Sequence, residues 1–263
     1  MKKQRFTALA AFLAAALAIP ASANSFEAAV GTPVIDGKPD DAYKAAQEIP
    51  VNLKTSGDGL TYGTASVLWD KENIYVYFNV TDPVLSEEAS TGAFYVMDSV
   101  DFGLDLSGTP GNIEEINAGH YTAAAPVEDD MIFSWRGGGK HFMRNAVNAA
   151  YASVLTENGY AVEMMIPWGE DYKPEADAVI GAVFHINSDE DGKSGCEGNY
   201  FSGEGQQYLW KTTENYDSLT LTSKKYERMV VPICMGFVVE ASGISGAMTA
   251  SLKKAAENLK INP

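Results

Sequence analysis

Apolar and polar residues alternate along much of the middle of the chain, with the two-residue period of strands that bury one face. In residues 73–80 the side chains at every second position are apolar and point to one side. In residues 99–106 a second apolar set faces away from Asp101 and Asp105. Each segment therefore predicts a strand of a sheet that is packed on one side.

Similar signals predict further strands at residues 63–69, 119–125, 131–135, 160–166, 180–187, 208–210 and 218–222, with hairpin turns at 70–73 and 156–159. One short helix is predicted at residues 40–47, where the Asp40 side chain can cap the free amides. Many short strands, few helices and no alternation of strands with helices predict an all-β fold. We expect an antiparallel two-sheet β-sandwich, jelly-roll or immunoglobulin-like, with about nine to eleven strands.

The first 23 residues have the three parts of a secretory signal peptide. Basic residues at positions 2, 3 and 5 precede an apolar stretch at 8–19, and Ala21-Ser22-Ala23 matches a cleavage site. An uncleaved anchor is less favoured because Pro20 follows a stretch that is too short to span a bilayer. We therefore expect a secreted or periplasmic protein, with no membrane attachment after cleavage.

The net charge indicates which classes of partner are unfavourable, and the two cysteines raise the question of a disulfide bond. The 263 residues carry a net charge of −16, and the mature chain from Asn24 has 16 basic and 35 acidic side chains, a net charge of −19. This sign argues against nucleic acid and anionic membranes as partners. Export permits a disulfide between Cys196 and Cys234, and two unpaired buried cysteines are an equal alternative.

The composition changes only after residue 222. We assign residues 24–222 to the sandwich domain and residues 223–263 to a C-terminal extension of unassigned role. The extension contains an apolar run at 229–239, which Pro232 interrupts, and helical spacing at 244–259. The prediction is a short strand and a helix packed on the sandwich, because the interrupted run is too short for a membrane span.

Five sequence blocks, in order and with consistent spacing, resemble the family 9 carbohydrate-binding module over residues 28–222. They are GTPVIDGKPDDAY at 31–43, ASVLWD at 65–70, IYVYFNVTDPVL at 74–85, DSVDF at 98–102 and GYAVEMMIPW at 159–168. The resemblance implies a secreted β-sandwich that binds β-linked glucan or xylan polysaccharide or oligosaccharide ends. It also implies a protein without catalytic machinery, which can accompany a glycoside hydrolase and often carries structural calcium.

In that family two aromatic rings clamp one terminal sugar. Flat rings cover the apolar faces of a pyranose and leave its hydroxyl rim free for hydrogen bonds. Followed residue by residue, the resemblance places the clamp at Tyr95 and Trp210. It also places His185 where the family tends to have an amide side chain, and His120 and Tyr121 near a basic residue of the family. The expected carbohydrate-binding residues are therefore Tyr95, Trp210, His185 and Tyr121.

Two acidic sets are candidate calcium ligands, because Ca²⁺ binds hard oxygen atoms. Asn187, Asp189 and Asp191 stand at alternate positions before a turn glycine, and a solvated acidic turn is the alternative there. Asp82 and Asp98, with Asp101, are the second set, and acids at such strand ends are more often surface groups or turn formers.

Haem binding is the alternative function class. Sandwiches similar to this module occur as haem b domains of exported redox enzymes, in which Met97, His120 and His185 could supply axial ligands. No Cys-x-x-Cys-His motif is present, so covalent haem is excluded. We favour carbohydrate binding, because aromatic residues occupy both clamp positions, and we expect no organic cofactor. Glycosidases use a pair of acidic side chains. Pairs of adjacent acidic residues in loops are usually solvated, so such pairs in this sequence do not predict a glycosidase.

Overall fold

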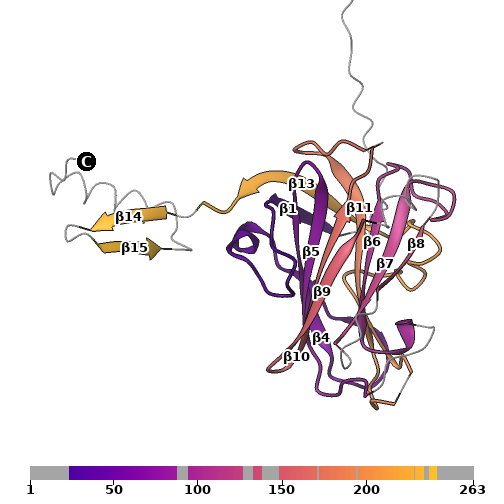
Figure 1. Ribbon diagram of the computed structural model, residues 1–263. Helices are drawn as coiled ribbons and strands as arrows, with labels where there is room; N and C mark the ends of the chain where they lie inside the picture. The colour runs from indigo at the N-terminus through magenta and orange to yellow at the C-terminus, as the bar shows by residue number, and fades with distance from the viewer. Residues whose placement is uncertain are drawn as a thin grey trace, which may run out of the picture.

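The structure is a computed structural model that describes residues 24–87, 94–126, 133–137, 148–170, 172–193, 195–227, 229–233 and 237–241 (Figure 1). Its strands are β1 (Ser25–Val30), β2 (Ile49–Val51), β3 (Leu53–Ser56), β4 (Tyr62–Trp69), β5 (Asn73–Thr81), β6 (Ser99–Asp105), β7 (Ala118–Ala124), β8 (Phe133–Gly137), β9 (Ala150–Thr156), β10 (Gly159–Pro167), β11 (Val179–Ser188), β12 (Gly198–Phe201), β13 (Asp217–Lys225), β14 (Met229–Ile233) and β15 (Phe237–Ala241). Two 3₁₀ helices, η1 (Asp41–Ala45) and η2 (Phe94–Val96), are the helical elements of these described ranges. The described chain is therefore almost entirely β, as predicted.

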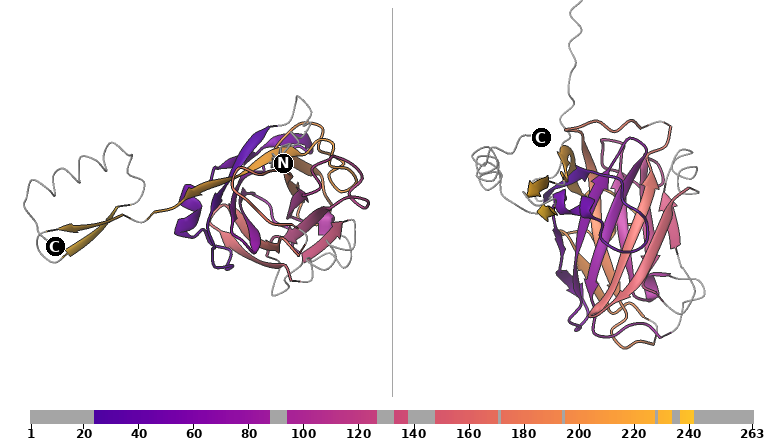
Figure 2. Two further views of the ribbon diagram at one scale, coloured as in Figure 1. Left: turned by 90° about the horizontal axis from the view of Figure 1, so that it is seen from above. Right: turned by 60° about the vertical axis from the view of Figure 1, so that its left-hand side comes forward.

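Thirteen strands are hydrogen-bonded into one sheet that folds over itself into two layers (Figure 2). One layer contains β8, β7, β6, β11 and β13 in that order, and the other contains β4, β5, β10 and β9. Strand β1 joins the layers, because it pairs first with β13 and then, through its last two residues, with β4. The edge strands β8 and β9 lie at opposite ends of the pairing order, so the sheet is not closed.

The direction of β1 corrects one part of the fold prediction. Both of its pairings are parallel, whereas the remaining pairs of the sandwich are antiparallel. The sandwich is therefore mixed rather than purely antiparallel. An alternating pattern shows which face of a strand is buried and carries no information about the direction of its neighbours.

The core lies between the layers and follows from the alternation. The Phe184 ring of β11 packs against the rings of Phe26, Phe78 and Phe102, with centroids 6.1, 6.2 and 5.4 Å away. All four rings are buried, and each contributes about 2–3 kcal/mol by leaving water. This packing turns the alternate positions of β6 and β11 outward.

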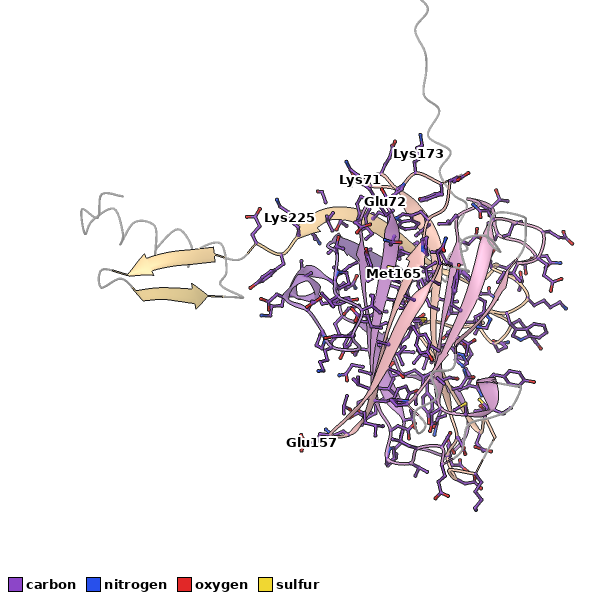
Figure 3. All side chains as sticks on the ribbon, in the orientation of Figure 1. Lys71, Glu72, Glu157, Met165, Lys173 and Lys225 are labelled. Carbon is purple, nitrogen blue, oxygen red and sulfur yellow. The ribbon has the colours of Figure 1, made fainter. Side chains whose placement is uncertain are left out.

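The predicted hairpin turns at residues 70–73 and 156–159 are present at opposite ends of their layer. Figure 3 shows Lys71 and Glu72 at one end and Glu157 at the other. In the first turn the Asp70 amide donates to the carbonyl oxygen of Asn73 (3.0 Å). These turns set the register in which β4, β5, β10 and β9 pair.

Other local predictions need correction. Residues 208–210 form a turn instead of a strand. The predicted helix at 40–47 is the shorter 3₁₀ helix η1, and the Asp40 carboxylate accepts a hydrogen bond from the Val34 amide (2.6 Å) instead of capping it. Strands β1, β2, β3, β9 and β12 were not predicted, because their short segments do not alternate clearly.

The first residues of the C-terminal extension, 223–225, complete β13, and a hairpin follows them. Strands β14 and β15 pair with each other in a separate two-stranded sheet, which Figure 1 shows apart from the sandwich, where a single packed strand was expected. The predicted helix at 244–259, the signal segment and Cys234 lie outside the described residues, so those predictions stay open. Within the described residues, no helix has the length and apolarity needed to cross a membrane.

Candidate functional site

A buried polar cluster surrounds Asp101 on the outer face of the β6–β11 layer. Its carboxylate oxygens lie 3.0 Å from His120 Nε2 and 2.7 Å from His185 Nδ1. The same carboxylate accepts hydrogen bonds from Thr122 Oγ1 (2.5 Å) and Asn187 Nδ2 (2.9 Å). Neighbouring strands bring these groups together, because Asp101 is paired with Thr122 on β7 and with His185 on β11.

These neighbours keep Asp101 ionised. Burial acts to raise the pKa of this carboxyl, but the facing His120 and His185 and their hydrogen bonds hold it well below its usual range. A buried carboxylate with this many donors is a fixed negative group with a defined orientation. Each of its two oxygens already has two of these partners, so the carboxylate orients the surrounding side chains rather than contacting a ligand itself.

His185 forms part of the floor of this cluster. Its ring stacks on Phe201, with centroids 4.1 Å apart and planes 15° from parallel. Its Nε2 lies 3.0 Å from Asn199 Oδ1, so both ring nitrogens contact protein groups. The structure therefore places His185 in the cluster as a buried residue that positions Asp101.

The structure corrects the assignment of Tyr121. This side chain is fully buried in the core between the layers, where a sugar cannot reach it. Residues next to each other on a strand point to opposite faces, so Tyr121 turns inward while His120 turns outward to Asp101. The outward residue of this pair is therefore His120.

Trp210 lies in a turn, residues 206–212, that is held against the outer face. Leu209 packs with Val183, Phe201 and Tyr216 in a small buried cluster. The Tyr216 hydroxyl donates to the Leu209 carbonyl oxygen (2.7 Å). The turn is therefore fixed to the layer at its centre, and the Trp210 side chain remains 43% exposed.

A glycine in β6 makes room for this contact. A Cβ built on Gly103 would lie 2.4 Å from the Tyr216 hydroxyl oxygen, which is closer than real Cβ atoms approach any neighbour. Tyr216 therefore packs directly on the backbone of β6 at Gly103. This places the Trp210 turn beside that end of the polar cluster.

Tyr95 lies at the other end of the cluster. It belongs to η2, which leads directly into Ser99 of β6, and the neighbouring Val96 carbonyl accepts a hydrogen bond from the Gly195 amide (3.0 Å). The Tyr95 side chain is 63% exposed. Positions 99, 101 and 103 of β6 share one face at steps of about 7 Å, so the segments that carry the two clamp residues flank Asp101.

A second acidic cluster joins members of both predicted calcium sets. Asp98 accepts hydrogen bonds from the amides of Ser86 (2.6 Å) and Asp189 (2.8 Å). Ser86 Oγ lies 3.0 Å from an Asp189 carboxylate oxygen, and Ser188 Oγ lies 3.3 Å from one of Asp82. Asp82, Asp98 and Asp189 are all buried, and Asp189 directly follows the last residue of β11.

Two of these carboxylates, Asp82 and Asp98, repel each other. Burial, followed by the negative charge of Asp82, raises the pKa of Asp98 to about 7. Burial also raises the pKa of Asp82. The oxygen donors are of the type that Ca²⁺ prefers, although in the described residues no three His, Cys, Asp or Glu side chains are arranged to share one metal ion.

Asn187 and Asp191, the other two residues of the predicted calcium loop, contact groups outside this acidic cluster. Asn187 donates to Ser99 Oγ (3.0 Å) and to Asp101, and so belongs to the first cluster. Asp191 is exposed at the surface, 3.5 Å from Lys193 Nζ. Asn187, Asp189 and Asp191 therefore do not converge on one point, because only Asp189 turns toward the buried acids.

The haem alternative requires iron ligands from Met97, His120 and His185. Both imidazoles instead contact the same carboxylate, that of Asp101. Met97 is buried at the start of β6. The geometry of these residues therefore supports a hydrogen-bonded cluster more directly than a pair of axial ligands.

Comparison with known proteins places this geometry in a family. Residues 35–224 match the model described as carbohydrate family 9 binding domain-like. The chain belongs to this family. Members of this carbohydrate-binding family are non-catalytic binding modules, often found attached to xylanases, and the family assignment confirms the resemblance found in the sequence.

Two curated relatives are larger enzymes that contain a similar segment. Endo-1,4-beta-xylanase A of Thermoanaerobacterium saccharolyticum is 30% identical over 204 residues, which are 77% of this chain and 16% of that protein. Exoglucanase XynX of Acetivibrio thermocellus is 30% identical over 195 residues, 74% of this chain and 17% of that protein. The chain therefore spans about a sixth of these relatives.

Two solved structures of a family 9 module from Caldicellulosiruptor kristjanssonii share the fold. The glucose complex is 21% identical, with a TM-score of 0.65 over 76% of this chain and 97% of that chain. The cellotriose complex is 22% identical, with a TM-score of 0.64 over 80% of this chain and 99% of that chain. The likeness confirms the β-sandwich of this family 9 member.

The sequence analysis missed the central group of the site. Asp101 was grouped with Asp82 and Asp98 as a candidate calcium ligand instead of with the clamp residues, and neither Thr122 nor Asn199 was singled out. A signal was present, since Asp101 lies within the DSVDF block and on the outward face of its strand. Its partners come from strands far away in the sequence, so the cluster itself was not predictable from local spacing.

Proposed function

We propose that the mature chain is an exported carbohydrate-binding protein that holds a β-linked glucan or xylan saccharide between Tyr95 and Trp210. The observation that supports this proposal is that Tyr95 and Trp210 are both exposed and belong to segments that flank the buried Asp101 along β6. The rings supply apolar surface for the faces of a pyranose, and the polar side chains that Asp101 orients offer hydrogen bonds to its hydroxyls.

The partner proteins follow from the same family membership. We propose that the chain acts beside a glycoside hydrolase, in the way that similar segments form part of xylanases and an exoglucanase. The signal-peptide pattern of residues 1–23 supports export. The chain then contributes attachment to polysaccharide and leaves bond cleavage to the partner.

Calcium is a second part of the proposal. The repulsion between the Asp82 and Asp98 carboxylates supports a cation there, with serine hydroxyl and backbone oxygens as further ligands. Such an ion would neutralise the buried carboxylates and hold the segments around residues 82–98 and 189. Its role is structural, below the η2 segment that carries Tyr95.

The clamp is tested by titration calorimetry with glucose, cellotriose and xylotriose. We expect Trp210→Ala and Tyr95→Ala each to weaken binding at least 10-fold, because each removes one wall of the site. Both rings are exposed, so the denaturant midpoints should stay close to that of the unmodified chain. Tyr62→Ala is the matched control, since Tyr62 is 54% exposed but begins β4 in the other layer.

Three results would contradict the proposal. The first is the absence of binding to any of these saccharides by the unmodified mature chain. The second is unchanged affinity in both Trp210→Ala and Tyr95→Ala. Equal losses in Tyr62→Ala and in the clamp variants would also count against it, because they would show a general effect of removing surface aromatic area.

A further inference from the structure

Asn24, the residue that follows the expected signal-peptide cleavage site, is fixed to the sandwich by hydrogen bonds. Its backbone nitrogen donates to Asp217 Oδ1 (2.8 Å), and its side-chain Nδ2 donates to the Ser202 carbonyl oxygen (2.8 Å). Its carbonyl oxygen accepts from the backbone nitrogen (2.9 Å) and the hydroxyl (3.1 Å) of Ser218. Strand β1 begins at the next residue and pairs with β13. These contacts hold the Asn24 nitrogen against the Asp217 carboxylate.

Asp217 is a buried carboxylate, 1% exposed, at the start of β13. Its second oxygen, Oδ2, accepts hydrogen bonds from Ser202 Oγ (2.8 Å) and Gln206 Nε2 (2.9 Å). In the part of the chain that the structure describes, the groups that donate to Asp217 are therefore neutral. Both oxygens act as acceptors, which is the role of the ionised form. A cationic donor would stabilise such a group more strongly than neutral donors do.

A glycine allows the close packing of this site. A Cβ built on Gly203 would lie 2.8 Å from Asp217 Oδ1 and 3.1 Å from Asn24 Nδ2. The Gly203 amide donates to Gln206 Oε1 (2.9 Å), which helps to orient the Gln206 side chain toward Asp217. Gly203 therefore lets the backbone after β12 approach both the carboxylate and Asn24.

Signal-peptide cleavage changes the chemistry of the Asn24 nitrogen. The pattern Ala21-Ser22-Ala23 predicts hydrolysis of the bond between Ala23 and Asn24 by a signal peptidase. Water is added across this bond, so Ala23 leaves with a carboxylate and the Asn24 nitrogen becomes a free amine. An α-amine is protonated below its ordinary pKa of about 8. A neutral amide donor is thus replaced by a cationic donor, and its other hydrogens can face water because Asn24 is exposed.

We propose that the α-ammonium group of Asn24 forms an ion pair with Asp217, so that removal of the signal peptide stabilises the fold of the exported chain. The proposal rests on the export part of the proposed function and is independent of saccharide binding. Asp217 of β13 is the charged group that faces the Asn24 nitrogen, whereas Ser202 and Gln206 from the segment after β12 are neutral. The pair also links the N-terminus to Gln206, which begins the Trp210 turn.

Thermal unfolding of two chains at pH 6.5 tests the ion pair. One chain begins at Asn24, and the other keeps Ala21-Ser22-Ala23 in front of it. Both have a hydrogen-bond donor at the Asn24 nitrogen, but only the first carries a charge there. We expect the chain that begins at Asn24 to unfold about 2–4 °C higher.

The difference between the two chains should depend on pH. The nearby carboxylate favours the charged amine, so the pKa of the Asn24 α-amino group should be about one unit higher in the folded chain than its ordinary value of about 8. The stabilisation is therefore complete below about pH 8 and is lost as the pH rises through about 9. An NMR titration of the Asn24 α-amino group measures the same shift directly.

Two variants identify the carboxylate. In Asp217→Asn, the chain that begins at Asn24 and the extended chain should unfold at the same temperature, because the anion is absent from both. Glu163→Gln is the matched control, since Glu163 is also buried but lies in the other layer, and there the difference of about 2–4 °C should persist. Each comparison is made within one variant, so a general loss of stability does not affect it.

Mass analysis of the chain exported from a bacterial host should give Asn24 as its first residue. A different first residue, equal unfolding temperatures for the two unmodified chains, or an α-amino pKa at its ordinary value would overturn the proposal. The NMR titration decides the matter if Asp217→Asn does not fold. None of these measurements uses a saccharide, so a failure to bind saccharides would overturn the proposed carbohydrate binding and leave this ion pair standing.

Discussion

The substitution Asp82→Asn isolates the repulsion between two buried carboxylates. Asp82 Oδ1 accepts a hydrogen bond from the Val84 amide (3.1 Å), and Oδ2 lies 3.3 Å from Ser188 Oγ. An asparagine can keep its oxygen on Val84 and donate its amide hydrogens toward Ser188 and Asp98, since a serine hydroxyl can also accept. The change therefore removes a charge and preserves the local hydrogen bonds.

The sign of the effect follows from Asp98. Its pKa is about 7 in the folded chain, against an ordinary value of 3.8. Between these values the folded state keeps a proton that the unfolded state releases, so the free energy of unfolding falls as the pH rises from about 4 to about 7. Above pH 7 this loss is complete, and in the calcium-free protein it destabilises the fold.

The magnitude can be worked from the same two pKa values. One pH unit between them corresponds to about 1.4 kcal/mol, so the whole gap is worth about 4 kcal/mol. Burial is the first cause of the raised pKa of Asp98 and the charge of Asp82 is the second, and only the second is removed. We therefore expect Asp82→Asn to gain about 1–2 kcal/mol at pH 8 in excess chelator, with a much smaller gain at pH 4.

Urea unfolding at pH 4, 6 and 8, with chelator present, measures this difference. Asp191→Asn is the matched control, since it removes an equal charge from an exposed position beside Lys193 and should leave the free energy of unfolding nearly unchanged. The reasoning is refuted if Asp82→Asn is no more stable than the unmodified chain at pH 8. It is equally refuted if Asp191→Asn gives the same gain, because the effect would then come from net charge.

Two further predictions concern calcium and the Trp210 turn. Millimolar calcium should raise the thermal midpoint of the unmodified chain above its value in chelator, because the ion binds only the folded state, and Asp82→Asn should lose most of this rise; coincident curves would contradict a calcium site. Tyr216→Phe should lower the free energy of unfolding by about 1 kcal/mol and also weaken saccharide binding, since it removes the hydrogen bond to the Leu209 carbonyl oxygen. Tyr43→Phe should lower the free energy of unfolding by a similar amount without changing saccharide affinity, because the Tyr43 hydroxyl donates to Glu163 in the other layer. Equal saccharide affinity in Tyr216→Phe and Tyr43→Phe would show that the turn does not position Trp210.

Strand faces were the most predictable feature of this chain. The alternating segments at residues 73–80 and 99–106 became β5 and β6, with their apolar sets in the core. Residues 208–210 form a turn instead, because only the central residue, Leu209, packs into the apolar cluster that contains Val183. A three-residue run of apolar and aromatic side chains is too short to distinguish these outcomes.

The clamp residues could be predicted from the resemblance to a family, whereas the hydrogen bonds around Asp101 could not be predicted from the sequence pattern. Tyr95 and Trp210 came from resemblance to a family, and the structure adds that both side chains are exposed. Tyr121 was placed on the wrong face, although the alternation of β7 separates it from His120. The hydrogen bonds around Asp101 join residues on three strands, so they depend on register, which periodicity leaves undetermined.

The burial of β6 shows why the site lies on this face. All seven residues of β6 are buried, although only alternate ones are apolar, so loops cover its polar face. Buried carboxylates need partners, and the two on this face find them in different ways. Asp105 accepts from Thr213 Oγ1 (2.6 Å), which fastens the segment after the Trp210 turn. Asp101 is instead held by side chains of the neighbouring strands, and it fixes the polar cluster between the segments that carry the two exposed aromatic residues.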